Sequence, residues 1–281
     1  GDVKLAKDEL LEIDVTDTSP AQPCATFGLH PSLDFVRELY ADGDAAFVAN
    51  IGSLIEPMDR TAYYDGTKRI PPQIFAHNMG TKAAHNLHPQ DGSSKGVLGR
   101  ILDAIQEQRS AQGRAYSISG NAKILDGESG APDIIYAKNG VVKLTLPSIG
   151  PMISQVLAPA SASVFGETYA GLTEAALTRS EVVGDALADI VLPHEDTFDG
   201  SGIADQLKQV AKLVNVSHAL QTDRAAFFVQ IGGFDTHSDV GAVLEENLGQ
   251  IDRALRSLVS ELKAMGRWDE VAILSKSEFG R

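Results

Sequence analysis

Residues 227–237 read FFVQIGGFDTH, and this stretch says most about the fold. Its first five residues are almost all apolar, which is typical of a strand buried in a parallel sheet, because both faces of such a strand meet packed layers. Two glycines follow, and glycine allows the backbone to turn at the end of a strand. We therefore predict a buried central strand that ends shortly before Asp235 and His237.

Asp235 and His237 are the first candidate site residues. If this stretch is extended, side chains two positions apart lie on the same side of the chain. Open α/β sheets usually bind ligands beyond the carboxyl ends of their strands, which is where this pair falls. A carboxylate with an imidazole suits Zn²⁺, Mn²⁺ or Fe²⁺, so we interpret the pair as metal ligands. The alternative is that Asp235 caps the following turn or helix and His237 is an ordinary polar residue.

The pattern downstream is that of a helix and a second strand. Residues 243–264 carry Leu and Ile spaced four and three positions apart, which places them on one stripe of a helix. The apolar run VAIL follows at residues 271–274. A strand, helix, strand succession predicts two parallel neighbouring strands joined by a right-handed crossover. Further patterns predict helices at residues 97–108, 167–192 and 205–220 and a strand at residues 45–52.

Other parts of the chain define its organisation. Residues 1–26 are polar and acidic and are expected to form an extended arm, whereas residues 27–281 are expected to form one α/β domain. Asn139-Gly140 lies between two β-rich runs, which is a strong signal for a hairpin over residues 134–146. Since a hairpin pairs antiparallel, we expect it outside the parallel central sheet, as a local ribbon at an edge or in an insertion at about residues 116–166.

The composition excludes several classes of partner and site. The 281 residues include 38 Asp and Glu against 24 Lys and Arg, a formal net charge of −14, which argues against nucleic acid and anionic membrane surfaces as partners. The single cysteine, Cys24, excludes an internal disulfide framework and a thiolate metal cluster. No apolar run approaches the roughly 20 residues that a transmembrane helix needs.

Several segments occur in an order that resembles a known family. They are GLHPSLDFVRELYADGDAAFVANIG at residues 28–52, GVLGRILD at 96–103, DQLKQVAKLV at 205–214, GGFDTH at 232–237 and SEFGR at 277–281. From about residue 27 to residue 281 the chain resembles the domain-of-unknown-function 1501 family, which is itself similar to the alkaline phosphatase and sulfatase superfamily. The resemblance implies a three-layer α/β/α sandwich with a mostly parallel central sheet. It also implies an exported protein.

Five residues are candidates for the site, four of them through the resemblance and Arg100 through its own chemistry. Asp235 and His237 match a metal-binding Asp and His that follow a central strand, and Glu278 stands where further ligands follow the next strand. His77 matches a histidine of the family, and Arg100 is a candidate to hold an anionic group of a substrate. The alternatives are that Glu278 is a surface or ion-paired residue, that His77 is a solvated loop histidine, and that Arg100 pairs with one of the many acidic side chains.

The resemblance also sets an expectation for function. It implies hydrolysis of a phosphate or sulfate ester, either small or part of a sulfated or phosphorylated polymer, with Zn²⁺, Mn²⁺, Ca²⁺ or Fe²⁺ as the metal. The family's opening glycine-rich strand and its closing Thr-Asp-His-Gly segment are absent from this sequence. The nucleophile is therefore unassigned, and the chain is expected to be incomplete at both ends. The alternative is a non-catalytic exported structural or binding protein with an incomplete metal site; both functions are compatible with an oligomer.

Overall fold

The computed structural model describes residues 4–16, 22–49, 51–73, 75–109, 111–141 and 163–279. The chain divides into two compact units, each assembled from segments that are far apart in sequence. Unit 1 comprises Gly1–Gly92, Pro193–Lys208 and Val229–Arg281, and unit 2 comprises Ser93–Leu192 and Gln209–Phe228. Four of the five predicted site residues belong to unit 1, and the fifth, Arg100, belongs to unit 2.

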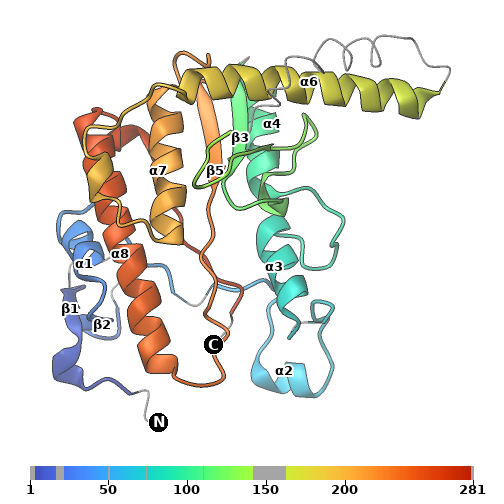
Figure 1. Ribbon diagram of the computed structural model, residues 1–281. Coiled ribbons are helices and arrows are strands. Elements are labelled where there is room, and N and C mark those ends of the chain that lie inside the picture. The colour runs from blue at the N-terminus through green and yellow to red at the C-terminus, as the bar shows by residue number, and fades with distance from the viewer. Residues whose placement is uncertain are drawn as a thin grey trace. The chain divides into compact units, whose positions relative to one another are not determined.

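Unit 2 contains a parallel sheet of three strands, β3 (Gly113–Ser117), β4 (Asp133–Ile134) and β5 (Arg224–Phe228). The strand order is β4-β3-β5, and both pairings are parallel. Figure 1 shows β3 and β5 side by side. The aromatic rings of Tyr116 and Phe227, which face each other in this register, stack with centroids 5.6 Å apart. The described residues therefore form an α/β fold with parallel strands, as predicted.

The helix α4 (Val97–Arg109) packs on this sheet and on the short helix η2 (Lys123–Leu125). Ile124 and Leu125 are buried there against the start of α4 and against β5. A Cβ atom on Gly99 would lie 2.3 Å from the backbone of Asp126, so this close approach of helix and loop requires glycine.

Two further helices contribute to unit 2. The long helix α6 (Val164–Leu187) is linked to β4 by an ion pair between Arg179 Nε and Asp133 Oδ1 at 3.4 Å. The helix α7 (Gly202–Asn215) is shared by the two units: its residues up to Lys208 belong to unit 1 and those from Gln209 on belong to unit 2. None of the described helices is both long enough and apolar enough to cross a bilayer.

Unit 1 is built around α8 (Val240–Ala264), which corresponds to the helix predicted at residues 243–264 and confirms it. The helix α1 (Asp34–Ala41) packs on α8 through Phe35, Leu39 and Val259. Unit 1 also contains the helices α2 (Arg60–Tyr64) and α3 (His77–Asn86) and the short helices η1 (Lys7–Glu9), η3 (Glu195–Thr197) and η4 (Trp268–Glu270). Its strands β1 (Leu11–Asp14) and β2 (Thr26–Leu29) form an antiparallel pair, so part of the predicted extended arm pairs with the chain that follows it.

The prediction that residues 229–231 and 271–274 form neighbouring parallel strands is wrong. The strand β5 ends at Phe228, because both backbone polar groups of Gln230 bond to the side chain of Gln206 instead of to a strand. Residues 271–274 form no strand, and Leu274 is 87% exposed. The predicted strand at residues 45–52 is likewise not observed over its described residues 45–49 and 51–52. Apolar composition favours a strand, but a strand also needs a paired neighbour.

The predicted hairpin is confirmed in its turn and only in part in its position. Tyr136 and Gly140 form an antiparallel bridge with two hydrogen bonds of 2.8 Å, as expected for the Asn-Gly turn between them. The residues just before the bridge, however, form β4, which joins the parallel sheet at its edge beside β3. The second arm of the hairpin, from residue 142 on, lies outside the described residues.

Candidate functional site

Three stretches of unit 1 bring acidic and imidazole side chains together. His77 is the first residue of α3, Asp235 lies in the connection that follows β5, and Glu278 lies near the end of the chain. His77 Nε2 is 3.5 Å from Asp235 Oδ2, and His77 Nδ1 is 3.6 Å from Glu278 Oε1. The imidazole of His77 therefore lies between two carboxylates.

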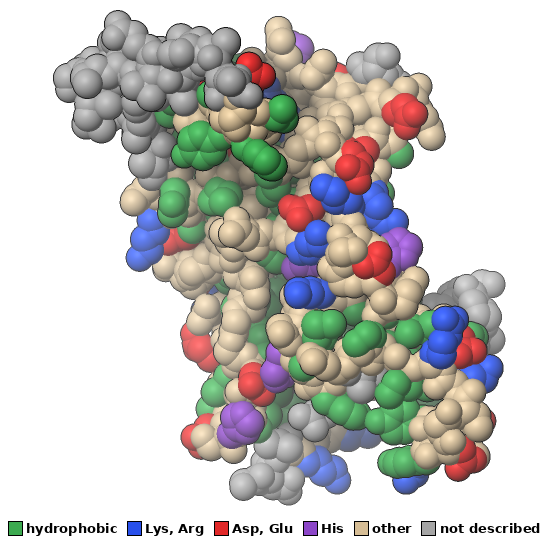
Figure 2. Space-filling view, turned by 90° about the vertical axis from the view of Figure 1, so that its right-hand side faces the viewer, with side chains coloured by type: hydrophobic (Ala, Val, Ile, Leu, Met, Phe, Trp, Pro, Cys, Tyr) green, Lys and Arg blue, Asp and Glu red, His purple; other side chains and the backbone are tan. Residues whose placement is uncertain are grey.

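His237 extends this cluster toward solvent. Its Nε2 atom lies 3.8 Å from Asp235 Oδ1, so the two side chains approach each other as their spacing in the sequence suggested. The side chain of His237 is 90% exposed and that of Asp235 is 55% exposed, which makes this part of the site open. Figure 2 likewise shows histidine side chains at the surface with acidic side chains near them.

The helix α3 positions His77 against the stretch that carries Glu278. The ring of Phe279 meets the imidazole of His77 edge-on, with centroids 5.2 Å apart. One turn further along α3, a Cβ atom on Gly80 would lie 3.6 Å from Glu278 Cβ, which is ordinary van der Waals contact. Glu278 is thus packed on α3 and, with a side chain 29% exposed, is less exposed than Asp235.

Two basic groups, His85 and Lys276, interact electrostatically with Glu278. Burial, which is the largest cause, and the positive charge of Lys276 together lower the pKa of the His85 imidazole to about 4, and Glu278 opposes them. Burial also lowers the pKa of the Lys276 ammonium, again opposed by Glu278. Because the pKa of His85 is far below neutral, this imidazole is uncharged at pH 7. Sequence reasoning assigned no role to Lys276.

The donor types of the cluster fit a divalent transition metal. Two ligand atoms on one tetrahedral ion, with bonds of about 2.0–2.1 Å, lie roughly 3.4 Å apart. The separation of Asp235 Oδ2 from His77 Nε2 (3.5 Å) and that of Asp235 Oδ1 from His237 Nε2 (3.8 Å) are close to that value, each through a different oxygen of the carboxylate. Across the part of the chain that the structure describes, no group of three or more His, Cys, Asp or Glu side chains is already gathered as an ion would require. The side chains of His77, Asp235 and His237 are each more than half exposed, so they can change rotamer without disturbing a packed core.

Arg100 is not part of this cluster. It lies in the first turn of α4, in unit 2, and is partly buried there. The structure thus brings together four of the five residues singled out from the sequence, and it places His77 in contact with the predicted metal ligands Asp235 and Glu278.

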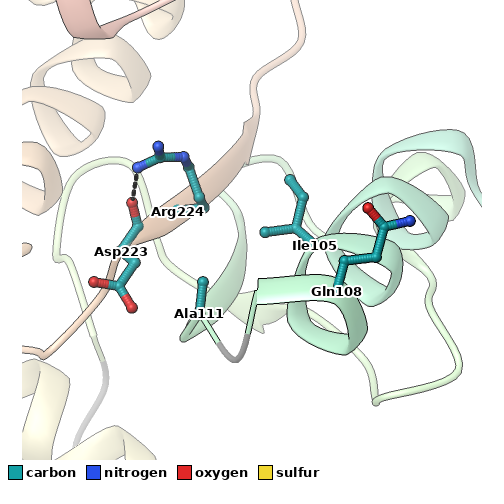
Figure 3. Close-up of a pocket in the computed structure, with 5 residues that line it drawn as sticks. All are labelled: Ile105, Gln108, Ala111, Asp223 and Arg224. Carbon is teal, nitrogen blue, oxygen red and sulfur yellow. Dashed lines mark hydrogen bonds between the residues drawn. The ribbon is translucent and has the colours of Figure 1, made fainter.

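The pocket shown in Figure 3 is a separate feature of unit 2. It has a volume of about 480 Å³ and is lined by Ile105, Gln108, Ala111, Asp223 and Arg224. Arg224 donates a hydrogen bond of 2.7 Å to the backbone carbonyl of Asp223, so its guanidinium is held to the rim. The pocket lies at the amino end of β5, whereas ligands of parallel sheets usually bind at the carboxyl ends. We therefore do not assign the site to it.

Comparison with known proteins supports the family resemblance. Residues 178–281 match the model of a family described as "Protein of unknown function (DUF1501)". No curated protein and no solved structure matches the chain. The matched region contains Asp235, His237 and Glu278. The predicted resemblance to that family is therefore confirmed over this region.

Proposed function

Starting from this resemblance, we propose that the protein is a metal-dependent hydrolase of phosphate or sulfate esters. The observation that carries the proposal is the convergence of His77, Asp235 and Glu278 from three distant stretches of the chain. The proposal includes an exported protein and a three-layer α/β/α sandwich of the alkaline phosphatase type. Its substrates are small anionic esters or the ester groups of sulfated or phosphorylated polymers.

In this proposal Asp235, His77 and His237 hold the metal. An ion held there would supply Lewis-acid chemistry, since it would polarise the non-bridging oxygens of the ester and make water a better nucleophile. Glu278 Oε1 lies 3.6 Å from His77 Nδ1, and in this proposal its charge favours the imidazole proton on Nδ1, which leaves the Nε2 lone pair on the side of Asp235. A carboxylate that orients a ligating histidine in this way is common in metal sites. Glu278, predicted from the resemblance as a ligand, thus acts here through His77.

A second candidate is a non-catalytic binding or structural protein. It is favoured by the absence, among the described residues, of three ligands already gathered around one point. The exposure of His237 and Asp235 also differs from the enclosed surroundings usual at a catalytic centre. In that case the two carboxylates next to His77 would serve to attach α3 to the stretches that carry them.

Metal analysis of purified chain separates the two candidates. We expect wild-type protein to hold one divalent ion per chain and to hydrolyse p-nitrophenyl phosphate or p-nitrophenyl sulfate. Asp235→Asn and His77→Gln should lose both properties. The matched control is Asp239→Asn, an exposed aspartate four residues further on, which should keep both. If the wild type is metal-free and inert while all variants fold alike, the hydrolase proposal fails and the binding or structural function replaces it.

A further inference from the structure

Six residues separate the end of β5 at Phe228 from Asp235, whose carboxylate belongs to the candidate site. Residues 229–235 have no regular secondary structure, and Gly232, Gly233 and Asp235 are exposed. A short exposed connection of this kind opens easily unless its backbone is held by other groups. Asp235 nevertheless has to stay within about 4 Å of His77 and His237 for the site to exist.

The side chain of Gln206 holds the first half of this connection. Its Oε1 accepts a hydrogen bond from the Gln230 N–H, and its Nε2 donates one to the Gln230 carbonyl; both are 2.8 Å long. The same Nε2 also donates to the Gly202 carbonyl within α7 at 3.2 Å. The amide therefore pairs with Gln230 as the backbone of a neighbouring strand would. Gln206 is only 8% exposed, and both of its bonds to Gln230 are partly buried.

The side chain of Asn247, on α8, contacts the second half of the connection between β5 and Asp235. Its Nδ2 donates a long hydrogen bond of 3.4 Å to the Gly232 carbonyl. Gly233 has a φ of +86°, and a Cβ at this position would lie 3.3 Å from Asn247 Nδ2. The turn before Asp235 is therefore fixed both by its backbone conformation and by the approach of α8.

We propose that Gln206 is a positioning residue of the candidate site, assisted by Asn247, and that the pair fixes the backbone that presents Asp235 to His77. This inference rests on the proposed function for its effect on metal binding. It goes beyond that function because it assigns control of the site to side chains on α7 and α8 that touch no ligand. The competing explanation is that Gln206 stabilises unit 1 as any buried amide would.

The chain offers a matched control for that explanation. Gln209 lies three residues further along α7, is also buried, and donates one hydrogen bond of 3.1 Å to the Ala137 carbonyl in unit 2. Gln206→Met and Gln209→Met remove the same amide from the same helix with a side chain of similar length. Asn247→Ala is a milder third variant, since it leaves the core untouched.

The test combines Co²⁺ titration of the full chain with amide hydrogen exchange. We expect Gln206→Met to weaken Co²⁺ binding about tenfold or more and to change the visible Co²⁺ absorption, which reports ligand geometry. Exchange should rise selectively in residues 229–237. Asn247→Ala should show a two- to threefold loss of affinity, and Gln209→Met should leave affinity, spectrum and exchange of this segment unchanged.

Two results overturn the inference. One is that Gln206→Met and Gln209→Met alter Co²⁺ binding equally and in step with their thermal stability. The other is that exchange in residues 229–237 stays as in the wild type when Gln206 is replaced. If the wild type binds no Co²⁺, the proposed function fails, and the exchange measurement alone decides whether Gln206 positions this segment. If Gln206→Met does not fold, the same two readouts on Asn247→Ala decide.

Discussion

His77 has a carboxylate beside each of its ring nitrogens. A neutral imidazole carries one N–H and one lone pair, so only one of the two carboxylates can accept a proton from it. Glu278 is the less exposed of the two, and charge interactions strengthen as water is excluded. Glu278 is therefore the better acceptor, and the nitrogen that faces Asp235 remains free to bind a cation.

The first prediction concerns Glu278. Replacing it by Gln removes the acceptor that orients His77, and loss of such a partner typically weakens metal affinity 10- to 100-fold. We expect Glu278→Gln to bind Zn²⁺ that much more weakly in a competition titration with a chelating dye. Glu245→Gln, an exposed change on α8, is the control. Equal affinities for the wild type and Glu278→Gln would show that Glu278 does not act through His77.

A second residue-scale prediction concerns Glu261, which is fully buried on α8. Its Oε1 accepts a hydrogen bond of 2.6 Å from the His194 N–H, whereas Oε2 has no hydrogen-bond partner among the described residues. Burial raises the pKa of this carboxyl, the bond and charge of His194 oppose the rise, and Glu195 and Asp196 add to it.

The pH dependence follows from the sign of that shift. A carboxyl whose pKa is higher in the folded than in the unfolded state stabilises the fold below its unfolded pKa, and this stabilisation is lost as the pH rises through the folded pKa. Chemical unfolding from pH 4.5 to pH 8 should thus show Glu261→Gln gaining stability relative to the wild type as the pH rises. A constant difference across this range would contradict the raised pKa.

At the scale of elements, helix ends and glycines determine how α1 and α4 are attached. Leu33, at the N-cap of α1, provides no side-chain cap. Asp252 of α8 takes its place, because its two carboxylate oxygens accept from the Phe35 N–H at 3.1 Å and from the Val36 N–H at 3.0 Å. This carboxylate therefore links α1 to α8 and satisfies two amides at the start of the helix.

The third prediction tests that link. Asp252→Ala should lower the free energy of unfolding by about 1–2 kcal/mol, as expected for a lost helix cap. Asp252→Asn keeps one acceptor oxygen and should lose roughly half as much. Urea denaturation of both variants gives these values, with the exposed Asp269→Asn as the control. Equal losses for Ala and Asn would mean that the charge at the end of α1, rather than the two bonds, stabilises it.

Two helical glycines provide the fourth prediction. A Cβ on Gly99 of α4 would lie 2.3 Å from Asp126, so Gly99→Ala should destabilise unit 2 by about 1–3 kcal/mol through overpacking. A Cβ on Gly171 of α6 would meet nothing within 4 Å. Gly171→Ala should instead stabilise by up to about 1 kcal/mol through helix propensity. Thermal unfolding of the two variants should show shifts of opposite sign, and shifts of the same sign would contradict the close approach at Gly99.

At the scale of the whole molecule, local patterns predicted elements better than they predicted pairing. The helices α4, α7 and α8 follow from apolar spacing, which depends only on neighbours along the chain. The runs at residues 45–52 and 271–274 have the composition of strands, but a strand also depends on distant partners. The same holds at Gln230, where the side chain of Gln206 takes the place of a strand.

The candidate site shows a similar division. Asp235 and His237 stand out because their types and spacing suit a cation, while His77 and Glu278 were found through the family resemblance. Gln206, Asn247 and Lys276 were missed. A glutamine on an amphipathic helix gives no sign in the sequence that it bonds to a backbone 24 residues away. Burial of a histidine likewise depends on the packed structure around it.

Exposed apolar residues in unit 1 lead to the last prediction, which concerns self-association. Figure 2 shows hydrophobic side chains reaching the surface in several places. Among the exposed ones are Val48 at 75%, Ile51 at 79% and Leu274 at 87%, all on extended segments outside any described strand. Unpaired backbone beside apolar side chains is a template for pairing with another chain. The net charge of −14 opposes this association through repulsion that salt screens.

Sedimentation velocity at low and high salt tests whether apolar contact or charge repulsion determines the association state. At 0.5 M salt the screening length falls to about 4 Å, so charge repulsion between chains is nearly eliminated. We therefore expect the wild type to associate through its apolar segments at this salt concentration. The double variant Val48→Lys and Leu274→Lys places a cation on each apolar segment and should stay monomeric under the same conditions. Val191→Lys, an exposed valine of unit 2 at 82%, should associate like the wild type. Equal association of all three proteins would place the contact elsewhere on the surface.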